Sequence, residues 1–395
     1  MLKRIVIFGA VPIALALAAP AQGGYYSSID SRNETMLWSR DYFNVFRNVM
    51  DNLSTISSEK PATNPPIRRR YLFIEILARD GTLKLDTLEQ KLDYSTVLIR
   101  RGRALEAARF LDVVTGENKN AENFLLASQH ATAYFLSADR GLERESGRLM
   151  KKALEKWPQS WEGLSEDQKE LLKSFGILHA IDFDHYRKCE VLFQRLMENR
   201  LKEKSRQEKK ETVEETVDPI FRDAKGDPIR FLNEKGEYEA GRIANADKEQ
   251  MPREAVEYVQ QLLLWMPGDD RLLWLLAETF NASAMEQTNP KEKNMAVWNA
   301  HKIFERLTNL KTPVKYGLKE IRKRSAVLEA HVNANPIDIA PPPPPEDPND
   351  VKMTSREWWW RQTVVLIVGL AVGMFVIWQI QETRRRRQAR AAAKS

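Results

Sequence analysis

An uncharged apolar run near the C-terminus constrains this chain more than any other feature of its sequence. From Thr363 to Ile380 the residues TVVLIVGLAVGMFVIWQI include no charged side chain. As an α-helix this run reaches about 27 Å, close to the hydrocarbon thickness of a bilayer. A buried core helix would not explain the tryptophans that flank it, as in the aromatic belts of membrane interfaces: Trp358, Trp359, Trp360 and Trp378. We therefore expect one transmembrane helix over residues 363–380.

The tail that follows, residues 381–395, predicts the orientation of this helix. It contains four consecutive arginines: Arg384, Arg385, Arg386 and Arg387. Clustered basic residues favour the cytoplasmic side of a membrane, where they also contact anionic lipid headgroups. We expect the tail to be cytoplasmic, the body to be extracytoplasmic or periplasmic, and the arginines and flanking tryptophans to contact lipid.

The N-terminus independently predicts the same topology. Lys3 and Arg4 precede an apolar run from Ile5 to Ala19, and small residues occupy the −3 and −1 positions before Gln22. These are the three parts of a secretory signal peptide, here residues 1–21. An uncleaved anchor is the alternative, but the run is shorter than the roughly 20 residues that a membrane-spanning helix prefers. A single-pass protein of the plasma (inner) membrane of a bacterium fits both ends.

The positive net charge of the chain comes from its two ends. Of the 61 basic and 55 acidic residues, the termini carry eight bases and one acid, which leaves 53 basic against 54 acidic residues. The body is therefore close to neutral, and the charge does not indicate a nucleic-acid partner. The single cysteine, Cys189, excludes a disulfide framework and a multi-cysteine zinc site. Its place in a helical pattern predicts a small core residue, with a reactive thiol as the weaker alternative.

Two stretches of helical periodicity predict two helical lobes, over residues 22–200 and 250–332. In the first lobe, one helix is expected to end near Arg101-Gly102, and a helix pair is expected to run from Asn120 to Pro158. In the second lobe, residues Ala255 to Phe304 show the same alternation of small and large residues, interrupted by a loop with Asn289-Pro290.

Both lobes resemble the tetratricopeptide (TPR) repeat, whose pattern combines large, aromatic and paired alanine positions with a final proline. The matching residues of the first lobe are Phe124, Ala127, Ser128, Ala153 and Pro158. Those of the second are Ala255, Val259, Leu262, Pro267, Leu273, Leu276, Ala277, Phe280, Ala300 and Phe304. The loop between the two helices of the first unit is expected to be longer than the family allows, so the unit is degenerate. A generic array of helical hairpins is the alternative, and both interpretations give an α-solenoid-like body.

The region between the lobes combines a helical and a non-helical part. Ser165 and Gln168 have the spacing of a capping box, and a long helix is expected from about Tyr186 into a charged linker over 201–218. Phe221–Asp227 is then echoed by Phe231–Glu237, each with a Lys-Gly pair typical of a turn. This repetition predicts a small β-meander over 219–245 that packs against a lobe. It would be either a structural wedge, which we favour, or a partner-facing element.

Two features near the membrane complete the predicted architecture. Residues 335–357 include five consecutive prolines, which favour an extended polyproline II stalk; a docking site for a proline-binding module is the alternative. Gly369 and Gly373 form a GxxxG motif inside the apolar run, and such a motif lets two helices approach closely enough to form a homodimer through this face. The whole pattern predicts a mostly α protein: TPR-like hairpins, an inserted β-meander and one C-terminal transmembrane helix.

No motif in the sequence predicts a catalytic, cofactor-binding or metal site. His179 and His185 lie closest among the histidines, with Asp182 and Asp184 between them, but their spacing does not place them on one helix face. We interpret them as exposed polar residues, and His130, His301 and His331 as isolated. The expected function is therefore a protein–protein interaction scaffold or complex subunit without enzyme activity. A cell-envelope hydrolase or polymer-processing enzyme on a helical body is the alternative, because such sites need no local motif.

Overall fold

The computed structural model describes residues 27, 46–47, 50, 53, 66–117, 123–210, 217–309 and 317–337. These residues contain twelve α-helices and no β-strand. The chain divides into residues 1–338 and 339–395, and every described residue belongs to the first unit. The predicted signal peptide, transmembrane helix 363–380, flanking tryptophans, basic tail and Gly369–Gly373 motif lie outside the described residues, as does the stalk beyond Ile337. Within the part that is described, no helix has the length and apolar character needed to cross a bilayer.

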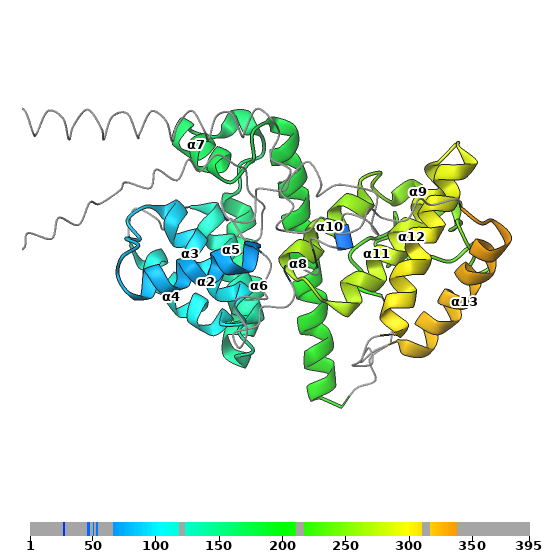
Figure 1. Cartoon of the computed structure of the whole chain (residues 1–395), viewed down its shortest axis with the longest axis horizontal. Helices are drawn as coiled ribbons and strands as arrows, with labels where there is room; N and C mark the ends of the chain where they lie inside the picture. The colour runs from blue at the N-terminus through cyan, green and yellow to red at the C-terminus, as the bar shows by residue number, and fades with distance from the viewer. Residues whose placement is uncertain are drawn as a thin grey trace, which may run out of the picture. The chain divides into compact units, whose positions relative to one another are not determined.

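Five helices form the first lobe: α2 (Pro66–Arg79), α3 (Leu88–Arg100), α4 (Ala104–Gly116), α5 (Phe124–Leu136) and α6 (Arg140–Lys156). Each packs against the next in chain order (Figure 1, blue to cyan). Their boundaries follow from local chemistry. The Thr87 side chain accepts a hydrogen bond from the Gln90 amide to cap α3, and Gly102 turns the chain after α3 with a φ of +73°.

The first TPR-like unit differs from its prediction in two respects. Only residues 137–139 connect α5 to α6, so the prediction of a long loop is wrong. The reason is that Asp139, inside the expected loop, caps α6 through its side-chain oxygen, which accepts hydrogen bonds from the amides of Gly141 and Leu142. The predicted C-terminal end is confirmed, since α6 ends before Trp157, but α5 begins at Phe124, four residues after the predicted start, because Asn123 caps it. Those two aromatic side chains pack with ring centroids 4.7 Å apart.

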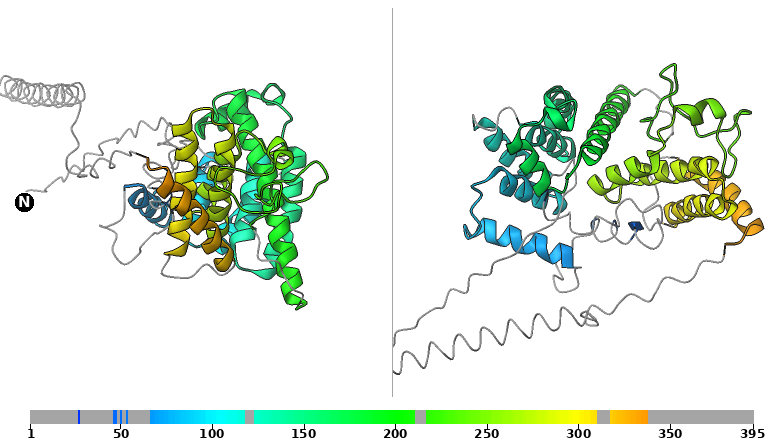
Figure 2. Two further views of the ribbon diagram at one scale, coloured as in Figure 1. Left: turned by 90° about the vertical axis from the view of Figure 1, so that its right-hand side faces the viewer. Right: turned by 90° about the horizontal axis from the view of Figure 1, so that it is seen from above.

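The long helix α8 (Ala180–Glu208) lies between the two lobes and contacts α6 on one side and α10 on the other (Figure 1). The view from above in Figure 2 shows the same order. In the chain, α8 follows the short helices η5 (Trp161–Gly163) and α7 (Glu166–Ser174). The predicted capping box of Ser165 and Gln168 is confirmed at the start of α7. Helix α8 begins earlier than Tyr186, because the Asp182 carboxylate accepts hydrogen bonds from the amides of residues 178 and 179. Cys189 is fully buried, which confirms it as a core residue.

The second lobe contains α9 (Asn245–Gln250), α10 (Ala255–Trp265), α11 (Asp270–Ser283), η6 (Ala284–Glu286), α12 (Pro290–Thr308) and α13 (Leu318–Ala334). The helices α10 to α13 pack successively on one another. Asn289, predicted to lie in a loop, caps α12, and Pro290 occupies its first turn, where a missing N–H costs nothing.

The predicted β-meander over 219–245 is wrong, because the described residues of this insert form no strand. Only two isolated bridges occur, Arg222 with Pro228 and Glu239 with Arg242. Pro228 has no N–H to extend the first bridge, and Phe231 adopts a φ of +58°, which interrupts an extended backbone.

The turn chemistry of the insert, in contrast, is confirmed. Asp223 accepts hydrogen bonds from the amides of residues 225 and 227, and Asn233 accepts the same pair of bonds from residues 235 and 237. The two turns are therefore one motif used twice, which explains the echo in the sequence. The rest of the insert is held by burial of apolar side chains in the core: Ile220, Phe221, Ile229, Phe231, Tyr238 and Ile243.

Candidate functional site

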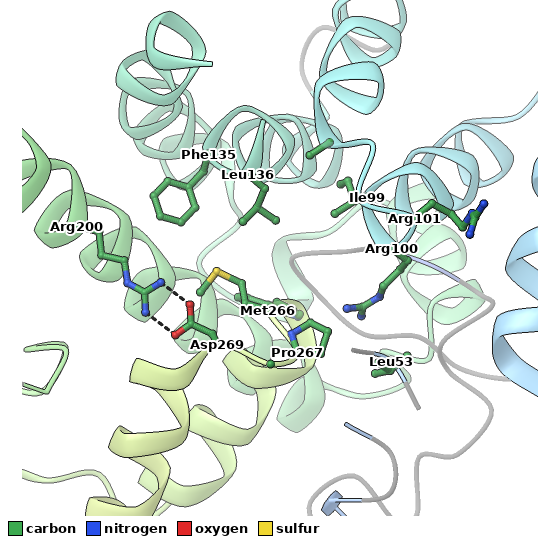
Figure 3. A pocket seen from close by; sticks show the side chains of 14 residues that line it. Leu53, Ile99, Arg100, Arg101, Phe135, Leu136, Arg200, Met266, Pro267 and Asp269 are labelled. Carbon is green, nitrogen blue, oxygen red and sulfur yellow. Dashed lines mark hydrogen bonds and ion pairs between the residues drawn. The ribbon is translucent and has the colours of Figure 1, made fainter. Parts of the chain in front are cut away.

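The first cavity, of about 560 Å³, lies where the ends of α3 and α5 meet the turn between α10 and α11 (Figure 3). Its apolar lining includes Ile99, Phe135, Leu136, Met266 and Pro267. The helices α3, α5 and α10 end here, and α4 and α11 begin, so side chains from separate elements converge without filling the space between them. An apolar cavity with a few polar groups is the common form of a binding site.

Arg100 provides the polar group on the α3 side of the first cavity. Its side chain is 9% exposed, and Figure 3 shows its guanidinium directed toward Pro267. The neighbouring Arg101 points away from the cavity, and its Nε donates to Glu75 at 2.9 Å. Arg103 also bonds to Glu75. Glu75 thus binds Arg101 and Arg103, and Arg100 is the arginine of this region whose guanidinium lies at the cavity wall.

The opposite wall belongs to a buried network of five charged side chains, which we call the Asp218 network: Arg200, Glu203, Asp218, Asp269 and Arg271. Arg200 bonds to Asp218 and to Asp269, each at 2.6 Å for the shortest pair of atoms. Arg271 bonds to Asp218 at 2.7 Å and to Glu203 at 2.5 Å. The Asp218 side chain is fully buried. The network thus joins α8, the start of the insert and α11.

Electrostatics in the Asp218 network favour the ionised form of Asp269. Burial alone would raise the pKa of Asp269, but the charge and hydrogen bonds of Arg200 and the amide of Leu272 lower it below the ordinary value. The pKa of Arg200 is raised, because its two carboxylate partners outweigh burial. Asp269 is the only acid among the described residues that line the first cavity, and it is held by Arg200. This geometry suits binding and does not favour general acid–base chemistry, which needs a group poised near neutral pH.

A second cavity, of about 490 Å³, lies between α8 and the insert. Its apolar floor includes Val217, Ile229 and Trp274, and Pro219 and Pro228 also line it. Its charged lining comprises Lys202, Glu203, Arg206, Arg230, Glu320 and Arg324. Glu203 is already paired with Arg271, and Glu320 with Arg324 at 2.9 Å.

The histidine–aspartate group between residues 179 and 185 does not converge on a site. His179 and Asp184 are exposed, as expected, but His185 is largely buried and packs on Tyr258 with ring centroids 5.0 Å apart. Burial, with the charge of Lys188, lowers the pKa of His185 to about 4. Burial also raises the pKa of the Cys189 thiol well above its ordinary value, which argues against a reactive thiolate. Among the described residues no cluster of side chains is suited to a metal ion.

The prediction that His130 is isolated is wrong. Its Nε2 lies 3.0 Å from an Asp112 oxygen, its Nδ1 lies 3.3 Å from the Thr115 hydroxyl, and Tyr134 donates to Asp112 at 2.6 Å. Burial lowers the pKa of His130 in spite of Asp112. These residues lie one helical turn apart on α4 and α5, a spacing that sequence could have revealed. None of them lines either of the two cavities, so we assign them to the packing of α4 on α5.

A second buried charge cluster links α11 to α13. Glu278 accepts hydrogen bonds from Trp274 at 2.7 Å and from Arg324 at 2.6 Å, and the Arg324 guanidinium lies over the Tyr238 ring. Burial raises the pKa of Glu278, although Arg324 and Trp274 act in the opposite direction. This cluster forms the wall of the second cavity behind Trp274 and Arg324.

Comparison with known proteins leaves the function to be argued from this geometry: no protein-family model, no curated protein and no solved structure matches the chain.

Proposed function

We propose that the protein is a non-enzymatic interaction scaffold, whose TPR-like α-solenoid body binds a segment of a partner protein in the first cavity. The observation that carries this proposal is the cavity itself. Apolar side chains from α3, α5 and the α10–α11 turn surround a space large enough for several side chains, and Arg100 lies in its wall. An apolar segment with a hydrogen-bond acceptor, such as a backbone carbonyl or a carboxylate, matches this lining.

The packing of successive helices supports the repeat-type body. From α10 to α13 each helix contacts the next, and short connections join most of the helices. Arrays of this kind build extended surfaces that bind polypeptides in many unrelated proteins. The likeness concerns architecture, and the identity of the partner has to come from experiment.

The proposed location is the plasma membrane, with the body on the extracytoplasmic side, and it rests on the sequence of the two ends. A reporter enzyme that is active only outside the cytoplasm, fused before Trp358 or after Ser395, tests the topology. Activity of the first fusion alone is expected. The Gly369–Gly373 motif is proposed to pair two copies, and Gly369→Ile with Gly373→Ile is expected to reduce self-association of the full chain in detergent.

The interaction role is tested by purifying the full chain in mild detergent and identifying the proteins that elute with it. Leu136→Asp places a charge in the first cavity and is expected to release the partner. Val113→Asp is the matched control, because Val113 is 71% exposed on α4 and does not line the cavity. Elution of the wild-type chain alone and monomeric, or equal retention of the partner by both variants, would contradict the proposal.

A further inference from the structure

We propose that the second cavity is a separate binding site for an acidic segment of a partner protein. This inference deepens the scaffold role proposed above, but it uses a different cavity and different residues. It rests on three features of the second cavity: cations without partners, an apolar floor and walls that are already fixed.

The cations of this cavity exceed its anions once existing pairs are removed. Glu203 is bound by Arg271, and Glu320 by Arg324, which also pairs with Glu278. Lys202 on α8 and Arg230 on the insert remain without a carboxylate partner among the described residues. Two unpaired positive charges on separate elements therefore border one cavity, and they favour a ligand with at least two negative charges.

The floor between these cations is apolar. The apolar lining that remains accessible is the exposed Pro228 and the half-buried Pro219 and Leu232, and beneath them lie Ile229 and Trp274, which are 2% and 1% exposed. A ligand that carries only charge, such as a free inorganic anion, would leave this floor uncovered. An extended polypeptide projects alternate side chains to opposite sides, so acidic side chains can reach the cations while apolar ones cover the floor.

The walls of the cavity are held in place by α8. The Asn199 side chain donates to the carbonyl of Pro219 at 3.2 Å, and Arg195 donates to the carbonyl of Ile220 at 3.3 Å. Asp218, which immediately precedes Pro219, is held by ion pairs with Arg200 and Arg271. Because these bonds fix the backbone at the start of the insert, a ligand does not have to order that part of the wall, and less of its binding energy is lost.

A protein ligand is favoured over a nucleic acid by the charge of the body. Residues outside the two termini carry nearly equal numbers of acids and bases, so the body has no net positive charge that would attract a nucleic acid. Two local cations on an apolar surface match a short acidic peptide better than a continuous phosphate backbone. Residues 211–216 of this chain include three glutamates close in sequence to the cavity, and the test has to separate them from a partner.

Fluorescence anisotropy of the full chain with fluorescein-labelled hexaglutamate tests the proposal, with hexaglutamine as the neutral probe. We expect hexaglutamate to bind with a higher affinity than hexaglutamine. Its affinity should fall as the salt concentration rises toward about 0.15 M. Lys202→Gln combined with Arg230→Gln is expected to weaken binding by about tenfold, from roughly 0.7 kcal/mol for each charge. Lys151→Gln combined with Lys152→Gln, on the exposed face of α6, is the matched control and is expected to change nothing.

Three results would overturn the proposal: no difference between the two probes, equal weakening by both double variants, or binding that appears only after Glu211, Glu214 and Glu215 are replaced by glutamine. The last result would assign the cations to the chain's own acids. Leu136→Asp lies outside this cavity and should leave hexaglutamate binding unchanged. Failure of the first-cavity experiment and failure of this one are therefore distinguishable.

Discussion

Replacing Gly317 by alanine tests how tightly α13 is docked on α11. Gly317 precedes α13 with a φ of +73°, and an added Cβ would lie 2.6 Å from Cη2 of Trp274 and still closer to its Cζ3. Trp274 is 1% exposed and donates to Glu278, so its ring has little freedom to move aside. The substitution therefore combines a backbone cost with a steric one.

Gly102 separates the two costs. Its φ is also +73°, but an added Cβ would meet no atom within 4 Å. Gly102→Ala should thus lower the free energy of unfolding by about 1 kcal/mol, from the left-handed backbone alone. Gly317→Ala should lower it by about 3–4 kcal/mol, because overpacking against a rigid ring adds about 2–3 kcal/mol.

Urea denaturation of the full chain, followed by far-UV circular dichroism, measures both values. In a Trp274→Phe background, which removes part of the ring system, the cost of Gly317→Ala should fall toward that of Gly102→Ala. Equal losses for the two alanine variants in the wild-type background would refute the steric argument and show that the α13 junction relaxes.

Three further predictions concern buried polar groups. Asp218→Asn should lower the free energy of unfolding by about 3 kcal/mol, because Arg200 and Arg271 lose a shared buried carboxylate; a loss below about 1 kcal/mol in urea denaturation would contradict this. His185 has a folded-state pKa of about 4 against an ordinary 6.5, so the unfolded chain takes up its proton first as pH falls. Protonation of His185 in the unfolded chain should thus lower the free energy of unfolding by about 3 kcal/mol as the pH falls from 6.5 to 4. His185→Gln should flatten this dependence of the free energy of unfolding on pH, and an unchanged dependence would refute the prediction. Asn281→Ala should cost about 2 kcal/mol, because the Asn281 amide bonds two backbone groups of the insert at 2.6 and 3.0 Å, and hydrogen exchange should increase in the insert but not in α5.

The helical part of the fold was predictable because its signals are local. The capping box at Ser165, the end of α3 near Gly102 and the burial of Cys189 all follow from residues within one or two helical turns. The start of α8 was missed, because the hydrogen bonds that extend it come from the Asp182 side chain, which the apolar pattern does not register.

The insert shows where local reasoning fails. Its two Lys-Gly turns were predicted correctly, yet turns do not create strands when the flanking residues cannot pair. Pro228 and the left-handed Phe231 prevent pairing, and burial against the second lobe takes its place. The candidate sites lay beyond prediction for a different reason. Arg200 lies 69 positions from Asp269 and 18 from Asp218, and nothing in a single sequence marks such distant charges as partners.

The Asp218 network also has a thermodynamic consequence for the scaffold. Arg200 and Asp269 face the first cavity, whereas Glu203 faces the second, so one set of ion pairs forms part of both. A ligand that displaces Arg200 changes the charge balance at Asp218 and therefore at Arg271 and Glu203. If two partners bind, the factor by which one alters the affinity of the other must equal the factor in the reverse direction. Only a ligand that moves Arg200 would couple the two cavities through these shared ion pairs, and a titration of one site would then report on the other.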